Sequence, residues 1–315
     1  MNLEFDYLIA GGGSAGCALA SRLCEDKSIT VCIVEAGGNG NNLFIKMPAG
    51  NGFVFGNPKL DWGYKSIPQK NLNNRTIYFP RGKSLGGSSI VNGMIYMRGI
   101  PSDYDSWRQL GLNGWGYSDI LPYFKKSEGS EHRNDKYHGN KGPLKIERSS
   151  NYGILEEAFI KSAVKAGHKS IDDFNGSERT GVSRLDSTVS NGVRQSSAIS
   201  YLKKKPDNLT ILTHQQISKL LINKTDVIGL ETLKGTKVYC KREVIICQGA
   251  FGTPHLLMLS GIGPADHLIK NDINPIVDLP GVGSNLADHV IASMQYSSDR
   301  NDLCHSKYQR IDKAF

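Results

Sequence analysis

The sequence shows little that would hold a chain in a membrane, and neither a membrane-spanning segment nor a secretory signal is expected. No apolar run approaches the roughly 18 residues that a membrane-spanning helix requires, so a transmembrane segment is not expected. A secretory signal would begin with a basic segment and continue with a long apolar one. Residues 1–6 are acidic instead and lead directly into a short apolar segment, so secretion by that route is not expected.

The sequence also lacks paired cysteines. None of the six stands in a C-x-x-C pair or at the spacing of a zinc site, so no metal site is predicted. The six are Cys17, Cys24, Cys32, Cys240, Cys247 and Cys304. Several lie in apolar segments, where free cysteine behaves as a small hydrophobic residue. A reducing compartment fits this usage best. We therefore expect a cytoplasmic protein, with peripheral contact at the inner membrane face left open.

Long runs of like charge are missing as well. The chain carries 38 Lys and Arg against 30 Asp and Glu, a net charge of +8, and its pI is near 9.0. Basic charge can attract nucleic acid, but the lysines are scattered and the longest run is Lys203–Lys205. A solvated face explains this pattern better. We expect no nucleic-acid partner, and a basic module that binds nucleic acid or an anionic surface is the least favoured alternative.

Glycine, in contrast, is in excess, with 35 in 315 residues against an average usage of about 7%. The first cluster lies within a complete βαβ pattern of about 30 residues. An apolar segment, a G-x-G-x-x-G turn, a helical pattern and a β-branched segment follow one another at residues 6–10, 11–16, 17–23 and 30–34. Glu35 closes the second predicted strand. Strand, turn, helix and acid in this order favour dinucleotide binding over a plain structural turn.

Each residue of this pattern has a physical role in that interpretation. Gly11 permits the tight turn, Gly13 lets a pyrophosphate approach the backbone, and Gly16 lets the helix pack closely on the strand. The pyrophosphate would lie at the helix N-terminus, where free N–H groups favour negative charge. Glu35 follows Gly16 at the distance that suits the ribose hydroxyls. An acidic residue at this position is unfavourable for the 2′-phosphate of NADP, so NADP is disfavoured. The motif does not distinguish NAD from FAD.

Two further glycine clusters adjoin regular segments. The glycines and serines of Arg81–Met94 give a backbone that can lie close to a flat or anionic ligand, with a flexible surface loop as the alternative. Glu243–Cys247 predicts a buried strand, and residues 248–252 predict a turn. A helix is predicted from Thr253 to Leu259, with Pro254 at a tolerated first position. The nucleotide domain is therefore predicted to be assembled from distant segments.

Together these clusters resemble the glucose–methanol–choline (GMC) family of FAD-dependent oxidoreductases. Residues 82–94 resemble the first signature of that family, and residues 249–263 resemble the second. Shorter similar stretches are 35–38, 103–107, 137–139 and 279–289. The resemblance runs from about Phe5 to about His289. Within the family it is closest to bacterial choline dehydrogenases and related alcohol dehydrogenases, in their N-terminal portion only.

The resemblance implies FAD as the cofactor. It implies that the ADP half is held by Gly11, Gly13, Ser14, Ala15 and Glu35, and that the flavin side is lined by Gly86, Ser89, Asn92, Gly93 and Met94. The position of Ile217 matches one whose backbone meets the adenine. The predicted cofactor-binding set also contains Gly16, Ala36, Gly249 and Ala250. Because Val91 stands where some members attach flavin through a histidine, we expect dissociable, non-covalent FAD.

The implied activity is oxidation of the CH–OH group of a small alcohol by hydride transfer to flavin N5. The histidine that serves as base lies, by resemblance, downstream of the matching region, so we predict no catalytic residue in this chain. His138 and His255 stand in family-like contexts, and His289 ends a family-like stretch, which leaves an approach to the flavin open, but none of the three is predicted as the base. A non-catalytic FAD-binding remnant, or one half of a split enzyme, stays open as an alternative. The electron acceptor stays open too.

The substrate is also left open between choline and other alcohols. A choline site needs aromatic faces or an acid near the quaternary ammonium. Aromatic residues around Asp61–Tyr64 are candidates, with ordinary packing at least as good an explanation.

The predicted fold class is α/β: a Rossmann-like FAD-binding domain with a parallel sheet and a small β-meander, plus an incomplete α+β substrate domain. Residues 1–150 are predicted to form the first part of the FAD-binding domain and 206–295 its second part. Residues 151–205 would begin the substrate domain, with a helix over 154–164, and 296–315 would begin a further segment of it. The meander is expected within residues 209–240, beside the main sheet.

Overall fold

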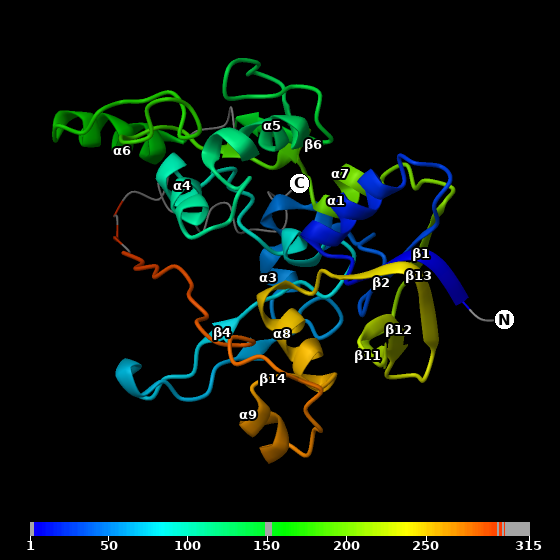
Figure 1. Cartoon of the computed structure of the whole chain (residues 1–315). Coiled ribbons are helices and arrows are strands. Elements are labelled where there is room, and N and C mark those ends of the chain that lie inside the picture. The colour runs from blue at the N-terminus through cyan, green and yellow to red at the C-terminus, as the bar shows by residue number, and fades with distance from the viewer. Residues whose placement is uncertain (1–2, 149–152, 295, 298, 300–315) are drawn as a thin grey trace. The chain divides into compact units, whose positions relative to one another are not determined.

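The computed structural model describes residues 3–148, 153–294, 296–297 and 299 (Figure 1). The chain forms two compact units. The first comprises Met1–Asn92 and Arg194–Asp288, and the second Gly93–Val193 and His289–Phe315. These units have other boundaries than the functional domains expected from the sequence, and those domains remain a prediction. In the described part of the chain no helix is long and apolar enough to cross a bilayer.

The first unit is built on a six-stranded sheet with the order β10-β2-β1-β13-β12-β11. Its strands are β1 (Leu3–Ala10), β2 (Val31–Val34), β10 (Leu209–Leu212), β11 (Ile217–Asn223), β12 (Asp226–Thr232) and β13 (Lys237–Ile246). The pairs β10–β2, β2–β1 and β1–β13 are parallel. The pairs β13–β12 and β12–β11 are antiparallel. The predicted α/β class with a parallel sheet and a meander is confirmed.

Two details of the predicted strands are wrong. Residues 211–212, expected in the meander, belong to β10, which pairs with β2 on the parallel side, because Leu209 packs among the buried side chains of that side. Residues 237–240 and 243–247 are expected from the sequence as separate strands, but residues 237–246 form the single strand β13, which ends one residue before Cys247. The two parts belong to one strand because β1 pairs with both, on either side of a register shift between Phe5 and Tyr7, while β12 pairs with residues 237–239. The meander is therefore continuous with the main sheet.

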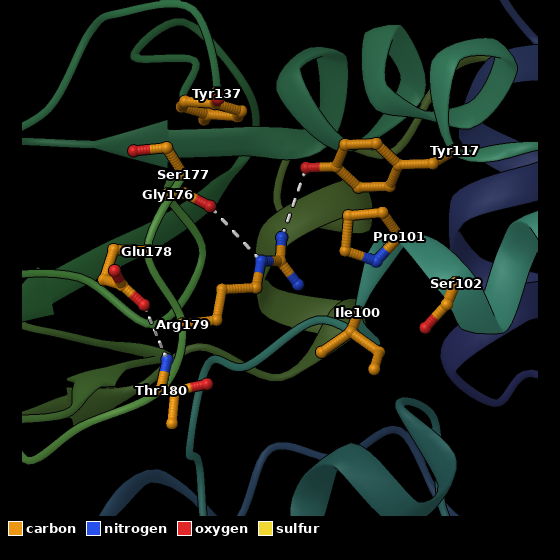
Figure 2. Close-up of a pocket in the computed structure, with 10 residues that line it drawn as sticks. All are labelled: Ile100, Pro101, Ser102, Tyr117, Tyr137, Gly176, Ser177, Glu178, Arg179 and Thr180. Atoms are coloured by element: carbon orange, nitrogen blue, oxygen red, sulfur yellow. Dashed lines mark hydrogen bonds between the residues drawn. The ribbon is translucent and has the colours of Figure 1, made fainter.

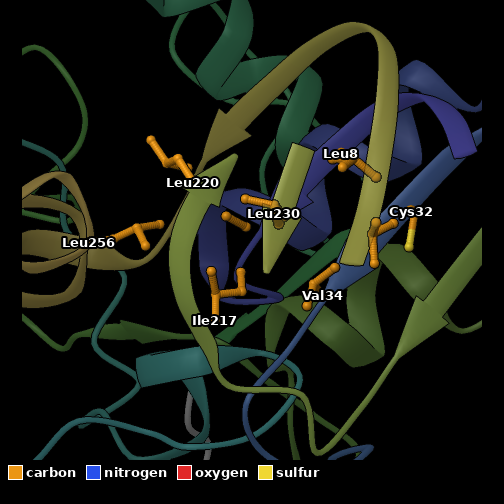
Figure 3. Packing of buried hydrophobic residues seen from close by; sticks show 9 residues of the cluster. Leu8, Cys32, Val34, Ile217, Leu220, Leu230 and Leu256 are labelled. Carbon is orange, nitrogen blue, oxygen red and sulfur yellow. The ribbon is translucent and has the colours of Figure 1, made fainter. Parts of the chain in front are cut away.

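Alternate side chains of the central strands pack on opposite faces of the sheet. Leu8 of β1 and Cys32 of β2 lie in one cluster with Leu230 of the meander and Leu256 of helix α8 (Gly249–Leu259), as Figure 3 shows. Ile9 lies in a second cluster, with residues of α1 (Ser14–Leu23) and α7 (Ser197–Leu202). Covered on both faces, β2 is buried at all four positions. Each such Val or Ile contributes about 1.5–3 kcal/mol of burial free energy.

The remaining elements of the first unit are short. They are α2 (Leu43–Lys46), η1 (Pro48–Gly50), α3 (Asn51–Val54), β3 (Tyr64–Lys65), η2 (Lys70–Leu72), β4 (Tyr78–Phe79), η3 (Gly87–Ile90), β14 (Ile262–Gly263), α9 (Ala265–Lys270) and β15 (Val277–Asp278). Helix α8 begins at Gly249, not at the predicted Thr253. Pro254 thus lies inside the helix, where it has no N–H to donate to the carbonyl of Ala250.

The second unit is a mixture of helices and short strands. Its elements are α4 (Pro101–Gln109), α5 (Tyr117–Ser127), β5 (Glu128–Ser130), β6 (Leu144–Arg148), α6 (Ile154–Lys165), β7 (Asp186–Ser187) and β8 (Val189–Ser190); β9 (Val193–Arg194) spans the boundary. The strands β5, β6 and β7 form one small sheet. The helix predicted over 154–164 is confirmed as α6.

Candidate cofactor site

The three glycine clusters, far apart in the sequence, meet in the first unit at the ends of β1 and β13. The Gly86 N–H donates to the Gly12 carbonyl at 2.8 Å, and the Cys247 N–H donates to the Ala10 carbonyl at 2.8 Å. A Cβ atom on Gly87 would lie only 2.6 Å from Cα of Gly13. Backbone thus packs directly on backbone here, and the clusters form one continuous site.

The first turn has the geometry that its glycine spacing predicts. Gly11 has a φ of +100°, and its N–H donates to the Val34 carbonyl at 2.9 Å. A Cβ on Gly16 would lie 2.1 Å from the Gly11 carbonyl oxygen, so no side chain fits there. Around Gly13, in contrast, the nearest atoms would be 3.7 Å from a Cβ. Gly16 therefore serves packing, while Gly13 leaves room at the backbone.

Helix α1 begins at this turn, and no side chain caps its N-terminus. Gly13 is its N-cap and contributes no side-chain hydrogen bond, and the first turn holds no acidic residue. The first N–H groups of a helix have no partner within it, and together with the helix dipole they favour an anion. Ser14 and Ala15 supply the first of these groups. The start of α1 thus has the chemistry that a pyrophosphate requires.

Glu35 joins the first glycine turn to the end of β2. Its carboxylate is 6% exposed. One oxygen accepts from the Gly12 N–H at 2.8 Å and the other from the Gly37 N–H at 2.7 Å. Burial raises the pKa of Glu35, and these hydrogen bonds and the charge of Lys83 oppose the rise. Each oxygen keeps a further lone pair, so the predicted bond to a ribose hydroxyl stays a prediction beside this structural role.

The segment before β11 lies along the same edge. The Gln215 N–H donates to the Glu35 carbonyl and the His214 N–H to the Gly37 carbonyl, both at 2.9 Å. Ala36 lies between those two acceptors, and Ile217, 9% exposed, begins β11 two residues after Gln215. The structure thus brings together the residues predicted for ribose and adenine.

The residues predicted for the flavin side form a tight turn. Gly86 has a φ of +98°. The Ser89 hydroxyl donates to the Gly86 carbonyl at 2.5 Å and accepts from the Ser197 N–H at 2.9 Å. Arg194 holds Asn92 by two hydrogen bonds, to the carbonyl oxygen at 2.7 Å and to Oδ1 at 2.9 Å.

The other predicted residues divide between the units. Gly249, with a φ of +73°, and Ala250 open α8 in the first unit. Gly93 and Met94 begin the second unit, where the Met94 carbonyl accepts from the Thr188 N–H at 2.8 Å. All the other predicted cofactor-binding residues belong to the first unit.

The aromatic segment considered for a cationic substrate serves packing in this structure. The Asp61 carboxylate accepts the backbone N–H groups of Gly56, Gly63 and Arg81, at 2.9, 3.0 and 3.0 Å, and the hydroxyl of Tyr78. Trp62 stacks with Tyr64 at 5.8 Å between ring centroids, and Lys83 Nζ lies 4.7 Å from the centre of the Trp62 ring. The acid and the indole face are already occupied, which supports the packing explanation.

His138, one of the histidines in a family-like context, is enclosed in the second unit. It is 0% exposed. Its Nδ1 lies 2.7 Å from Glu128 Oε1 and its Nε2 lies 2.8 Å from Asp173 Oδ2. Burial by itself would lower the pKa of His138, but the hydrogen bonds to Asp173 and Glu128, with their charges, raise it to about 9. A buried imidazolium between two carboxylates is a structural group.

The second unit also contains a cavity of about 470 Å³ (Figure 2), lined by Ile100, Pro101, Ser102, Tyr117, Tyr137 and residues 176–180. Arg179 crosses it toward Tyr117, whose ring centre lies 5.5 Å from the guanidinium. Each nitrogen of that guanidinium already donates within the unit, to Tyr117 and to the carbonyls of Gly99, Asn175 and Gly176. The cavity contains none of the predicted cofactor residues.

Cys17, Cys24 and Cys32 are buried, and Cys240 and Cys247 are partly buried. The cysteines in the described residues are free, and Cys304 lies outside them. Burial raises the pKa of Cys17 and of Cys32 to about 12, so neither is a nucleophile at neutral pH. In the described part of the chain no group of His, Cys, Asp and Glu side chains could hold a metal ion.

Two residues of the site were missed by sequence reasoning. Arg194 holds Asn92, and Asn51 accepts from Arg194 Nη2 at 2.6 Å. No sequence pattern marks either one, because their partners lie about 100 and 140 residues away. Only the position of Arg194, in a polar segment where the chain returns to the first unit, could have drawn attention to it.

Comparisons with known proteins give a consistent result. The family model described as GMC oxidoreductase matches residues 5–291. An oxygen-dependent choline dehydrogenase of Rhizobium etli is 43% identical over 293 residues, which are 91% of this chain and 53% of that protein. One of Photobacterium profundum is 39% identical and is matched over 100% of this chain and 56% of its own length. The chain thus spans about half the length of these curated relatives.

Solved structures show the same fold. Pyridoxine 4-oxidase from Mesorbium loti superimposes with a TM-score of 0.83 at 34% identity, over 88% of this chain and 55% of that one. A formate oxidase of Aspergillus oryzae, studied for modification of its FAD, gives a TM-score of 0.81 at 32% identity, over 88% and 51%.

Proposed function

The chain belongs to the GMC oxidoreductase family, and from that membership we propose that it binds FAD non-covalently and serves the oxidation of the CH–OH group of an alcohol. The observation that carries the proposal is the convergence of the three glycine clusters on the uncapped start of α1. An extended dinucleotide needs close backbone approach at several points along its length, and distant segments of this chain supply these points together.

The predicted cofactor-binding residues have separate tasks in this proposal. The N–H groups of Ser14 and Ala15 bind the pyrophosphate, and Gly13 lets it approach. Glu35 and the backbone at Ala36 and Ile217 hold the ribose and adenine. The turn from Gly86 to Asn92, with Gly93 and Met94 after it and Gly249 and Ala250 at the start of α8, holds the flavin. When bound, FAD supplies N5 as the acceptor of a hydride from the substrate carbon. Val91 offers no nucleophile for a covalent link.

We propose choline as the substrate to test first, because the relatives at about 40% identity are choline dehydrogenases. Other small alcohols are the comparison substrates. The name of those relatives also makes oxygen the first electron acceptor to test.

Flavin binding without turnover, alone or as half of a split enzyme, is the second candidate. The enclosure of His138 between two carboxylates favours it, because that histidine is not available as a base.

The purified chain should be incubated with FAD and separated from unbound FAD. Its absorbance spectrum should then show retained flavin. Heating should release free FAD into the supernatant, and yellow colour kept in the precipitate would contradict a non-covalent site. If the FAD-loaded chain reduces dichlorophenolindophenol only when choline is present, the result supports the proposal that the chain oxidises an alcohol. Bound flavin that choline and other alcohols leave oxidised supports the second candidate. A chain that retains no flavin refutes both.

A further inference from the structure

Arg194 is a buried cation without an acidic partner in the described part of the chain. Its side chain is 0% exposed, although charged side chains are almost never fully buried unless they are paired. Burial lowers the pKa of Arg194, but a guanidinium keeps its proton in proteins. The first unit therefore encloses a full positive charge that no carboxylate of the described residues neutralises.

Within the described part of the chain, the hydrogen-bond partners of the Arg194 guanidinium are all uncharged oxygens. Nη1 donates to the carbonyl oxygen and to Oδ1 of Asn92, at 2.7 and 2.9 Å, and lies 3.4 Å from the Ser89 carbonyl oxygen. Nη2 donates to Asn51 Oδ1 at 2.6 Å. Nε has no hydrogen-bond partner among the described residues. The guanidinium thus ties the start of α3 to the turn that contains Ser89 and Asn92.

That turn has little structure of its own to hold it. Between Gly86 and Asn92 it contains only the short 3₁₀ segment η3, and such segments are weakly stable alone. Its first residues, Gly86 and Gly87, contact the backbone of Gly12 and Gly13, and further contacts come from the segment where the chain re-enters the first unit. Besides Arg194, the Ser197 N–H donates to Ser89 Oγ at 2.9 Å, and a Cβ on Gly86 would lie 3.4 Å from Cβ of Ser196.

We propose that Arg194 is a positioning residue for the flavin: it fixes the Ser89–Asn92 turn in its binding conformation and supplies an uncompensated positive charge to that side of the site. The inference rests on the proposed function, since the turn is the one assigned to the flavin. A fixed cation in a low-dielectric interior favours added negative charge nearby, so it also makes a bound flavin easier to reduce.

The test uses the full chain loaded with FAD, with the variants Arg194→Met and Arg194→Lys. Arg179→Met is the matched control, because Arg179 also donates to carbonyl oxygens and has no acidic partner among the described residues, but lies in the second unit. Three quantities are measured: the FAD dissociation constant from quenching of flavin fluorescence, the flavin midpoint potential against reference dyes during dithionite titration, and the melting temperature of the apoprotein.

We expect Arg194→Met to weaken FAD binding about tenfold or more, since buried acceptors lose their donor, and to make the midpoint potential more negative. Arg194→Lys should weaken binding several-fold, because one ammonium does not reproduce the planar fork, yet keep the potential close to that of the wild type. Arg179→Met should lower the melting temperature and leave both flavin quantities unchanged.

A folded Arg194→Met variant with wild-type affinity and potential overturns the inference and leaves the proposed function intact. If Arg194→Met does not fold, Arg194→Lys decides: reduced affinity supports the inference and wild-type affinity overturns it. Equal losses of affinity in Arg179→Met and Arg194→Met overturn it as well, because they indicate general destabilisation. A wild-type chain that binds no FAD overturns the proposed function and the inference together.

Discussion

Replacing His138 should remove a large, pH-dependent part of the stability of the second unit. His138 lies in a buried group of two cations and two anions. Its ring contacts Glu128 and Asp173, and Arg98 Nη2 donates to Glu128 Oε2 at 2.5 Å. The cations balance the carboxylates, so neutralising one of them leaves a buried charge uncompensated, which is strongly unfavourable.

The magnitude follows from the pKa of His138, about 9 in the folded chain. An unfolded chain has a histidine pKa near 6.5, and the difference corresponds to about 3 kcal/mol of unfolding free energy. Because the folded-state pKa is the higher one, this contribution is complete below about pH 6.5. It is lost as the pH rises through about 9.

The assay is urea unfolding of wild type and of His138→Gln from pH 6 to pH 10, followed by tryptophan fluorescence. Trp107 and Trp115 both lie in the second unit and report on it. The difference in unfolding free energy between the two proteins should shrink by about 3 kcal/mol across this range. His168→Gln, an exposed position in the same unit, is the control and should stay within about 0.5 kcal/mol of wild type throughout.

A difference that stays constant from pH 6 to pH 10 would refute the reasoning, since His138 would then gain nothing from its charged form. A difference that shrinks equally in His168→Gln would point to a general alkaline effect on the chain.

Four further substitutions test the first unit. Gly16→Ala should unfold it or lower its stability by about 2 kcal/mol or more, because the methyl group would meet the Gly11 carbonyl oxygen at 2.1 Å. Gly13→Ala, with 3.7 Å of clearance, should keep the wild-type melting temperature and lose FAD affinity; equal melting temperatures for the two variants would contradict the packing argument. Glu35→Gln should lower stability by about 1–3 kcal/mol, since an amide cannot accept both backbone N–H groups; urea unfolding measures this, and an unchanged midpoint would contradict it. Asp61→Asn should likewise destabilise the loop it anchors, seen as faster proteolysis there, while wild-type cleavage would show that the hydrogen bonds of Asp61 are dispensable.

Local patterns predicted the first βαβ unit because its structure depends on neighbours in the sequence. The apolar segments, the spacing of Gly11, Gly13 and Gly16, and the acid at residue 35 each carry their own physical reason. The strand at 209–212 was misplaced because a short apolar segment does not reveal its pairing partner. Its edge position beside β2 follows from packing that only the folded chain shows.

The polar contacts of the site were less accessible to sequence reasoning. The spacing located Glu35 but not the Gly12 and Gly37 N–H groups that its carboxylate accepts. Arg194 and Asn51 carry no motif, and their roles arise only when Asn92 is brought beside them. Where distant segments converge, side-chain chemistry is set by tertiary contacts.

The bond between Arg194 and Asn92 also has a topological consequence. Asn92 is the last residue before the chain leaves the first unit and Arg194 is the first after it returns, yet the two are in direct hydrogen-bond contact. Residues 93–193 are therefore an insertion whose two flanking residues are hydrogen-bonded to each other. The loop entropy that such an insertion adds grows only slowly with its length, so the first unit can tolerate changes in the size of the second. A short glycine–serine linker in place of residues 93–193 should leave the six-stranded sheet intact.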